Sequence, residues 1–106
     1  MRRQSLGEFE QLVLLACIRL GPEAYSVPII EEIDRRTGRS ASHAAIYVAL
    51  KRLEKKGYVS SRIGDPSPER GGRSKRHYEV FPHAIEELRA SRDALLSMWE
   101  GVEARR

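Results

Sequence analysis

The sequence has a single cysteine, Cys17, and three histidines among its 106 residues. One cysteine cannot close a disulfide within the chain, and nothing else in the sequence indicates an oxidising compartment. The histidines His43, His77 and His83 fall on three different predicted elements, with no cysteine partner and no His-x-x-x-His spacing. We therefore expect no metal and no other cofactor.

The sequence also lacks a long apolar run. Its longest uninterrupted apolar stretch, residues 12–18, is far shorter than the roughly 20 residues that a membrane-spanning helix needs. The first residues lead into Glu8 and Glu10 and not into an apolar export signal. We expect a cytoplasmic protein without a membrane segment.

The sequence also lacks a recognisable catalytic arrangement. No serine, cysteine or lysine is accompanied by the base and orienting group that nucleophilic catalysis requires. Gly71 and Gly72 are not followed by the Gly-Lys-Ser/Thr of a phosphate-binding loop. Cys17 lies in an apolar helical run, which is typical of a small core residue. We expect a protein that is not an enzyme.

Positive charge is concentrated in the middle of the chain. Residues 35–77 hold twelve basic and three acidic side chains, whereas the two flanks together hold seven basic and twelve acidic ones. This asymmetry is typical of a segment that binds a polyanion and is held between acidic or neutral elements. A basic but otherwise ordinary solvated surface is the alternative on charge alone.

Apolar spacing predicts three helices in the first half of the chain, over residues 6–20, 27–37 and 43–56. Ser5 and Glu8 form a capping-box pattern before the first helix, and Ser42 is the predicted N-cap of the third. The third helix has a core side of Ile46, Ala49, Leu50 and Leu53. Its other side combines small, aromatic and cationic residues, with one acid, Glu54, in the whole helix. These residues are His43, Ala44, Tyr47, Val48, Lys51, Arg52 and Lys55.

After Gly57 the pattern changes to that of strands. Residues 58–63 and 75–81 are rich in β-branched and aromatic side chains, and residues 64–73 between them are turn formers and charges. The sequence therefore predicts a β-hairpin with a long basic tip that rests on the helices. The predicted fold is mainly α with a small β-hairpin, a winged helix-turn-helix over residues 1–81.

A last helix is predicted from Pro82 to about residue 104. Its apolar positions recur at alternating intervals of four and three residues, which is the seam of a coiled coil with one charged interruption. The seam consists of Phe81, Ile85, Leu88, Arg92, Leu95, Trp99 and Val102. A helix of this length exceeds what so small a domain covers, so residues 82–106 are expected to form a dimerisation helix packed on the same domain. Folding back over the first helix of its own chain is the alternative.

The order of elements resembles the PadR family of bacterial transcriptional regulators, in its short form with a single C-terminal helix. The likeness rests on three stretches: residues 6–21, residues 42–59 with their Ile-Tyr-x-Ala-Leu-Lys-Arg-Leu core, and residues 69–78 with their Gly-Gly-Arg-Ser-Lys-Arg run. The sequence departs from the family pattern at Ala45, Val48 and Phe81, and the first two changes concern base preference. The resemblance implies a homodimer that binds double-stranded DNA at a near-palindromic operator and regulates transcription, with repression favoured.

The residues expected to contact DNA lie on the third helix and the hairpin. Ser42 and Tyr47 are assigned to phosphate or sugar, with packing against the hairpin as the alternative for Tyr47. His43 and Ala44 are assigned to base edges, and Lys51 and Arg52 to phosphates or guanine. Arg73, Lys75 and Arg76 are assigned to the wing.

The expected dimer interface involves the first and the last helix. Its predicted residues are Phe9, Leu12, Leu88, Leu95, Trp99 and Val102. Since the resemblance implies that some relatives sense small molecules at the dimer interface, Trp99 is also a candidate contact for a small aromatic effector, with plain interface packing favoured.

Two other functions are compatible with a winged helix. The first is a protein–protein adaptor whose basic wing faces an acidic partner, which predicts a third helix of mixed charge. The second is RNA binding, which predicts exposed aromatic stacking platforms. The cationic third helix favours double-stranded DNA over both.

Overall fold

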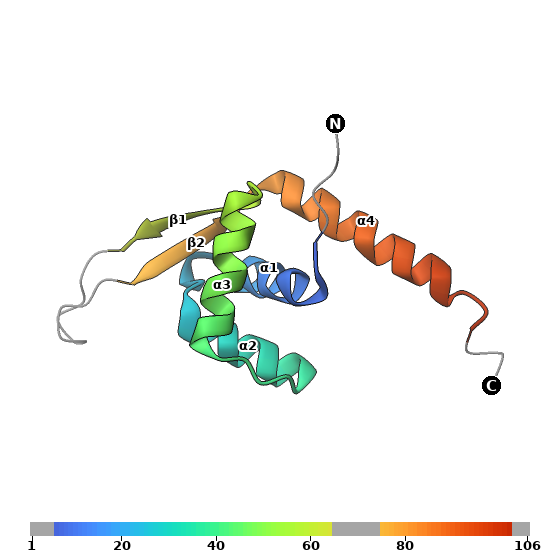
Figure 1. Ribbon diagram of the computed structural model, residues 1–106, viewed down its shortest axis with the longest axis horizontal. Coiled ribbons are helices and arrows are strands. Elements are labelled where there is room, and N and C mark those ends of the chain that lie inside the picture. The colour runs from blue at the N-terminus through green and yellow to red at the C-terminus, as the bar shows by residue number, and fades with distance from the viewer. Residues whose placement is uncertain (1–5, 65–74, 103–106) are drawn as a thin grey trace.

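The computed structural model describes residues 6–64 and 75–102, and within them it contains four α-helices and one antiparallel hairpin. Three helices form the centre of the molecule. The hairpin and the last helix extend from opposite sides of that centre (Figure 1).

Helix α1 spans Glu8–Leu20, so the predicted start at residue 6 is two residues too early. Gly7 is the N-cap, and its backbone N–H donates to Glu10 Oε1 over 2.9 Å. The carboxylate that reaches back is therefore that of Glu10, whereas the sequence pointed to Glu8; Ser5 lies outside the described residues. After α1, a short 3₁₀ turn, η1 (Gly21–Glu23), leads toward the second helix.

Helices α2 (Ser26–Thr37) and α3 (His43–Lys55) form the helix-turn-helix. The Ser42 hydroxyl accepts a hydrogen bond from the Ala45 backbone N–H at 3.0 Å, which confirms the predicted N-cap of α3. Gly38 ends α2 with a φ of 72°, in the left-handed region that glycine adopts without a steric cost.

Strands β1 (Val59–Ile63) and β2 (Arg76–Val80) pair antiparallel, with Val59 opposite Val80 and Ser61 opposite Tyr78. The hairpin is joined to the helices through its backbone, since the Tyr78 N–H donates to the Ala24 carbonyl over 3.0 Å. It forms the wing of the predicted winged helix-turn-helix.

The hydrophobic core lies between α1, α2, α3 and the inner side of the hairpin. Its largest fully buried side chains are Val13, Leu14, Ile29, Ile46, Leu50, Leu53 and Val59. Cys17 belongs to this core and is 3% exposed. Burial raises the pKa of the Cys17 thiol to about 12, so the sulfur stays protonated and is a poor nucleophile.

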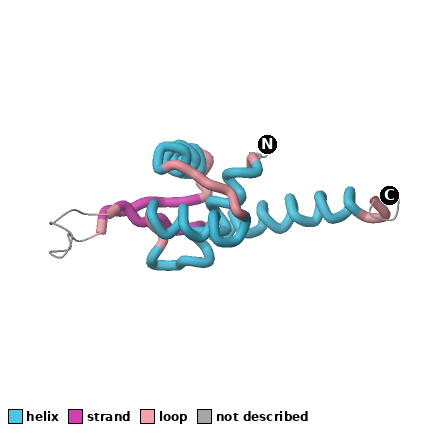
Figure 2. Tube along the Cα trace, turned by 90° about the horizontal axis from the view of Figure 1, so that it is seen from below, coloured by secondary structure: helices cyan, strands magenta, loops and turns pink. Residues whose placement is uncertain are grey.

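Helix α4 spans Pro82–Trp99 and touches the core only near its beginning, where Ala84 and Leu88 are buried. Its second half runs away from the other elements (Figures 1 and 2). The predicted end near residue 104 is wrong. Glu100 leaves the helical region with a ψ of 123°, and Gly101 has a φ of 81°.

Candidate nucleic-acid interface

The exposed side of α3 is the first part of the candidate interface. The four residues predicted to face the core are at most 4% exposed, whereas the seven predicted for the other side are all solvent-exposed. Tyr47 is 53% exposed, and Lys51 Nζ lies 5.7 Å from the centre of its ring. The helix therefore presents small, aromatic and cationic side chains to solvent, as the sequence predicts.

A groove separates α3 from the wing. It has a volume of about 380 Å³, and Tyr47 lines one wall while Lys75 and Arg76 line the other. Tyr25, which sequence reasoning did not single out, also lines this groove, and Lys75 Nζ lies 4.0 Å from the centre of its ring. The aromatic ring attracts the ammonium group and holds it beside the groove. Tyr25 precedes α2, far from the wing in sequence, so only the fold reveals the contact.

Part of the basic charge is neutralised inside the molecule. Glu32 on α2 is 9% exposed and accepts hydrogen bonds from Arg35, Arg36 and Arg19, the last of which comes from α1. The hydrogen bonds from Arg35 and Arg36 outweigh the effect of burial and lower the pKa of Glu32 to about 2. Arg19 thereby joins α1 to α2, whereas Arg35 and Arg36 pair with Glu32 within α2.

Two further ion pairs hold the start of α1. Arg39 Nη1 lies 3.0 Å from Glu8 Oε1, and Lys56 Nζ lies 2.8 Å from Glu10 Oε1. Burial by itself raises the pKa of Glu10, but the hydrogen bonds from Lys56 and the Gly7 N–H lower it below its usual value. The first pair joins the turn before α3 to the beginning of α1, and the second joins the beginning of α1 to the C-terminal end of α3.

The other described cations of the basic segment lie on α3 and the wing. Among the residues that the structure describes, six of them have no carboxylate within salt-bridge distance: Lys51, Arg52, Lys55, Arg62, Lys75 and Arg76. Arg76 Nη1 instead donates to the Ser61 hydroxyl, 3.0 Å away on the neighbouring strand. Arg73, also predicted for the wing, lies outside the described residues. Lys55 and Arg62 are additional cations that the predicted set does not include.

Comparison of the sequence with models of known protein families gives a match. Residues 14–89 match the model of the transcriptional regulator PadR-like family, which covers most of the chain and includes the helix-turn-helix and both strands of the wing. The chain belongs to the PadR-like family of transcriptional regulators. The membership confirms the resemblance found in the sequence and the expectation of a transcriptional regulator in place of an enzyme.

Solved structures confirm the fold class of this PadR-like chain. A transcriptional regulator from Clostridium thermocellum is similar with a TM-score of 0.71 and 20% identity, over 91% of this chain and 90% of that one. A PadR family regulator from Eggerthella lenta gives 0.69 and 21%, over 92% and 84%. The Aeropyrum pernix ORC1 protein in complex with DNA gives 0.65 and 24%, over 88% of this chain and 26% of that one. No curated protein matches the sequence at a significant level.

The residues predicted for a dimer interface of the PadR-like chain fall into two groups. Phe9 and Leu12 are half-buried against the core, and Leu88 is 7% exposed within its own chain. Leu95 and Trp99, at the far end of α4, and Val102, just beyond it, are solvent-exposed. They adjoin further exposed apolar side chains at Leu96 and Met98.

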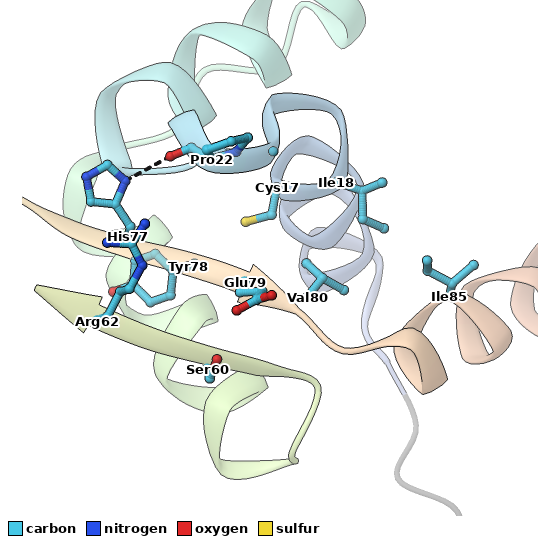
Figure 3. A pocket seen from close by; sticks show the side chains of 11 residues that line it. Cys17, Ile18, Pro22, Ser60, Arg62, His77, Tyr78, Glu79, Val80 and Ile85 are labelled. Atoms are coloured by element: carbon cyan, nitrogen blue, oxygen red, sulfur yellow. Dashed lines mark hydrogen bonds between the residues drawn. The ribbon is translucent and has the colours of Figure 1, made fainter. Parts of the chain in front are cut away.

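A second pocket, of about 480 Å³, lies on the other side of the wing from α3 (Figure 3). Ile18 of α1 and Ile85 of α4 line one end, and Arg62 and His77 on the strands line the other. His77 Nδ1 lies 3.1 Å from the Pro22 carbonyl oxygen, which ties the wing to the 3₁₀ turn. Trp99 is not among the residues that line this pocket.

Two other site types find no support in residues 6–64 and 75–102. There, no three histidine, cysteine or acidic side chains come close enough together to hold a metal ion. In the same ranges, no helix combines the length and the apolar character needed to cross a bilayer.

Proposed function

We propose that this PadR-like protein binds double-stranded DNA as a homodimer and represses transcription from a near-palindromic operator. The observation that carries the proposal is the division of the basic residues. Four cations of the basic segment are paired with carboxylates in the scaffold, and the six described cations without such partners lie on α3 and the wing. Cations without carboxylate partners on both α3 and the wing favour binding to a polyanion that contacts the two elements together.

In this proposal α3 enters the major groove and the wing lies along the backbone. His43 and Ala44, in the first turn of α3, face base edges, and Ser42 and Tyr47 contact phosphate or sugar. Lys51 and Arg52 reach phosphates or guanine edges. Lys75 and Arg76, together with Arg73, contact the backbone from the wing. The similarity to part of the Aeropyrum pernix protein, solved in complex with DNA, supports DNA binding by this chain.

Dimerisation through α4 is the second part of the proposal. The apolar side chains at the end of α4 are each between 42% and 77% exposed in the single chain, and such a patch is typical of an interaction surface. Pairing of two copies along residues 82–106 would bury it and place two α3 helices about one turn of DNA apart. Trp99 lies in this patch, so a small aromatic effector that binds there would act on the dimer.

The DNA-binding proposal is tested by salt dependence. Lys51→Ala and Lys75→Ala should each weaken binding to every duplex, because they remove sequence-independent phosphate contacts. The slope of log K against log salt should flatten by roughly one unit per lost contact, or about two per dimer. Fluorescence anisotropy with a labelled duplex at several salt concentrations measures both effects.

Arg89→Ala is the matched control for these variants. It also removes one exposed positive charge, but Arg89 lies on α4 and pairs with Glu86. The slope of log K against log salt for Arg89→Ala should equal that of the wild type. If Lys51→Ala and Lys75→Ala also keep the wild-type slope, α3 and the wing are not the interface. If the wild type has no salt-dependent affinity for duplex DNA, the adaptor function takes the place of the proposal.

A further inference from the structure

The first turn of α3 offers few side chains that can read a base. It consists of His43, Ala44, Ala45 and Ile46, of which Ile46 is fully buried and the two alanines carry no polar side-chain atoms. His43 is therefore the one residue of this turn whose side chain can form a hydrogen bond, and it is exposed. Ala44 and Ala45 can offer only apolar contacts, such as to a thymine methyl group.

His43 is not free to rotate without cost, because a side chain from another helix holds it. The Ser26 hydroxyl oxygen, on the first residue of α2, lies 2.8 Å from His43 Nδ1. Ser26 and His43 are 17 residues apart and lie at the amino-terminal ends of the two helices of the helix-turn-helix. The contact fixes the ring orientation and occupies Nδ1, which leaves Nε2 as the polar atom available to a partner.

The chemistry of this pair determines what Nε2 can do. When the Ser26 hydroxyl donates to Nδ1, the neutral ring carries its hydrogen on Nε2, which is then a donor. When both ring nitrogens carry a hydrogen, Nδ1 donates to the Ser26 oxygen and Nε2 is a donor. In the other neutral tautomer Nδ1–H donates to the Ser26 oxygen and Nε2 is an acceptor, so a hydrogen bond from Nε2 to a base requires one of the first two states, in which Nε2 carries the hydrogen. Major-groove edges of purines present the acceptor N7, and guanine adds O6.

We propose that His43 is a specificity-determining residue that reads one purine in each half-site through an Nε2–H bond to N7, and that Ser26 is its positioning residue. This inference rests on the proposed function, since it requires α3 to lie in the major groove. It adds a base class and a second residue to that proposal. It also explains why a hydroxyl outside the recognition helix points at the helix's first turn.

Selection of duplexes from a randomised library by the full chain tests the inference. The wild type should enrich a motif with a purine at one position per half-site, and His43→Ala should lose the preference at that position alone. Ser26→Ala should weaken the same preference, whereas Ser26→Thr, which keeps a hydroxyl, should retain it. Ser40→Ala, which removes another exposed hydroxyl near α3, is the matched control and should select the wild-type motif.

Replacement of the selected purine by its 7-deaza analogue supplies the atom-level test. The analogue should weaken wild-type binding by about three- to tenfold, the effect expected for one lost hydrogen bond, and should leave His43→Ala unaffected. Circular dichroism checks that each variant is folded. A position that selects a pyrimidine, or equal affinity of the wild type for the deaza and natural duplexes, would overturn the role of His43.

The outcomes separate this inference from the proposed function. If His43→Ala selects the unchanged wild-type motif, the protein is a sequence-specific DNA binder that reads bases with other residues, and only the inference fails. If Ser26→Ala selects the wild-type motif at full strength, Ser26 is not a positioning residue. If the wild type retains no duplex at low salt, the proposed function fails, and the inference fails with it.

Discussion

At the scale of single residues, Glu32 forms ion pairs with three arginines. One carboxylate accepts hydrogen bonds from three guanidinium groups on two helices, which lowers its pKa from the ordinary 4.5 to about 2. The unfolded chain therefore takes up the proton at a higher pH than the folded chain does. The charged form stabilises the fold above pH about 4.5, and this contribution is lost as the pH falls toward 2.

Glu32→Gln should be less stable than the wild type at pH 7, because the neutral amide cannot balance three arginines. The difference in the free energy of unfolding should shrink as the pH falls from 4.5 to 2, where the wild-type carboxylate becomes protonated. Urea titrations at a series of pH values measure this difference. The neighbouring Glu31 is exposed, and Glu31→Gln is the control. A Glu32→Gln deficit that is the same at pH 7 and pH 2.5 would contradict the argument.

At the scale of elements, the junction between α3 and the wing depends on Gly57. The Gly57 N–H donates to the Glu54 carbonyl and the Tyr58 N–H to the Leu53 carbonyl, each over 3.0 Å, which is the Schellman pattern of a helix end. Tyr58 and Leu53 are both buried, so the turn also directs an apolar side chain into the core. Gly57 has a φ of 83°, which an alanine adopts only with strain.

Gly57→Ala should therefore lower the free energy of unfolding by about 1 to 2 kcal/mol. No neighbouring atom would contact an added Cβ, so the loss comes from the backbone conformation and not from a clash. Gly57→Asn should lose less, because asparagine tolerates the left-handed region better than alanine does. Chemical denaturation of the three proteins gives the comparison, and equal losses for alanine and asparagine would count against a backbone origin.

Much of this element structure follows from local sequence patterns. The two sides of α3, its Ser42 cap and the extent of the hairpin strands depend on spacing and turn residues within short segments, and they could be predicted. The start of α1 could not, because both Glu8 and Glu10 offer a carboxylate near the helix start, and only the fold places Lys56 beside Glu10. The same holds for Tyr25 beside Lys75 in the candidate site, since such contacts join residues that are distant in the chain.

At the scale of the whole molecule, the wing and α4 extend from opposite sides of the three-helix core, over a longest dimension of 57 Å (Figure 1). Among the described residues, the cations without carboxylate partners lie on α3 and the wing. A group of exposed apolar side chains lies at the C-terminal end of α4 and just beyond it: Leu95, Leu96, Met98, Trp99 and Val102. The surface formed by α3 and the wing thus has the chemistry to meet a polyanion, while the far end of α4 has the chemistry to meet a second protein surface. This separation lets assembly be disturbed without touching the DNA-binding side.

The substitution Trp99→Asp tests dimerisation through α4. A charge in the apolar patch of α4 should shift the protein from dimer to monomer in analytical ultracentrifugation and abolish tight operator binding, since one recognition helix then binds without its partner. Weak binding to any duplex at low salt should remain, because α3 and the wing are unchanged. Ala90→Asp adds the same charge on the opposite side of α4, half a helical turn from the seam, and should stay dimeric. If Trp99→Asp also stays dimeric, α4 is not the dimer interface. Another surface must then join the two subunits and set the distance between their α3 helices.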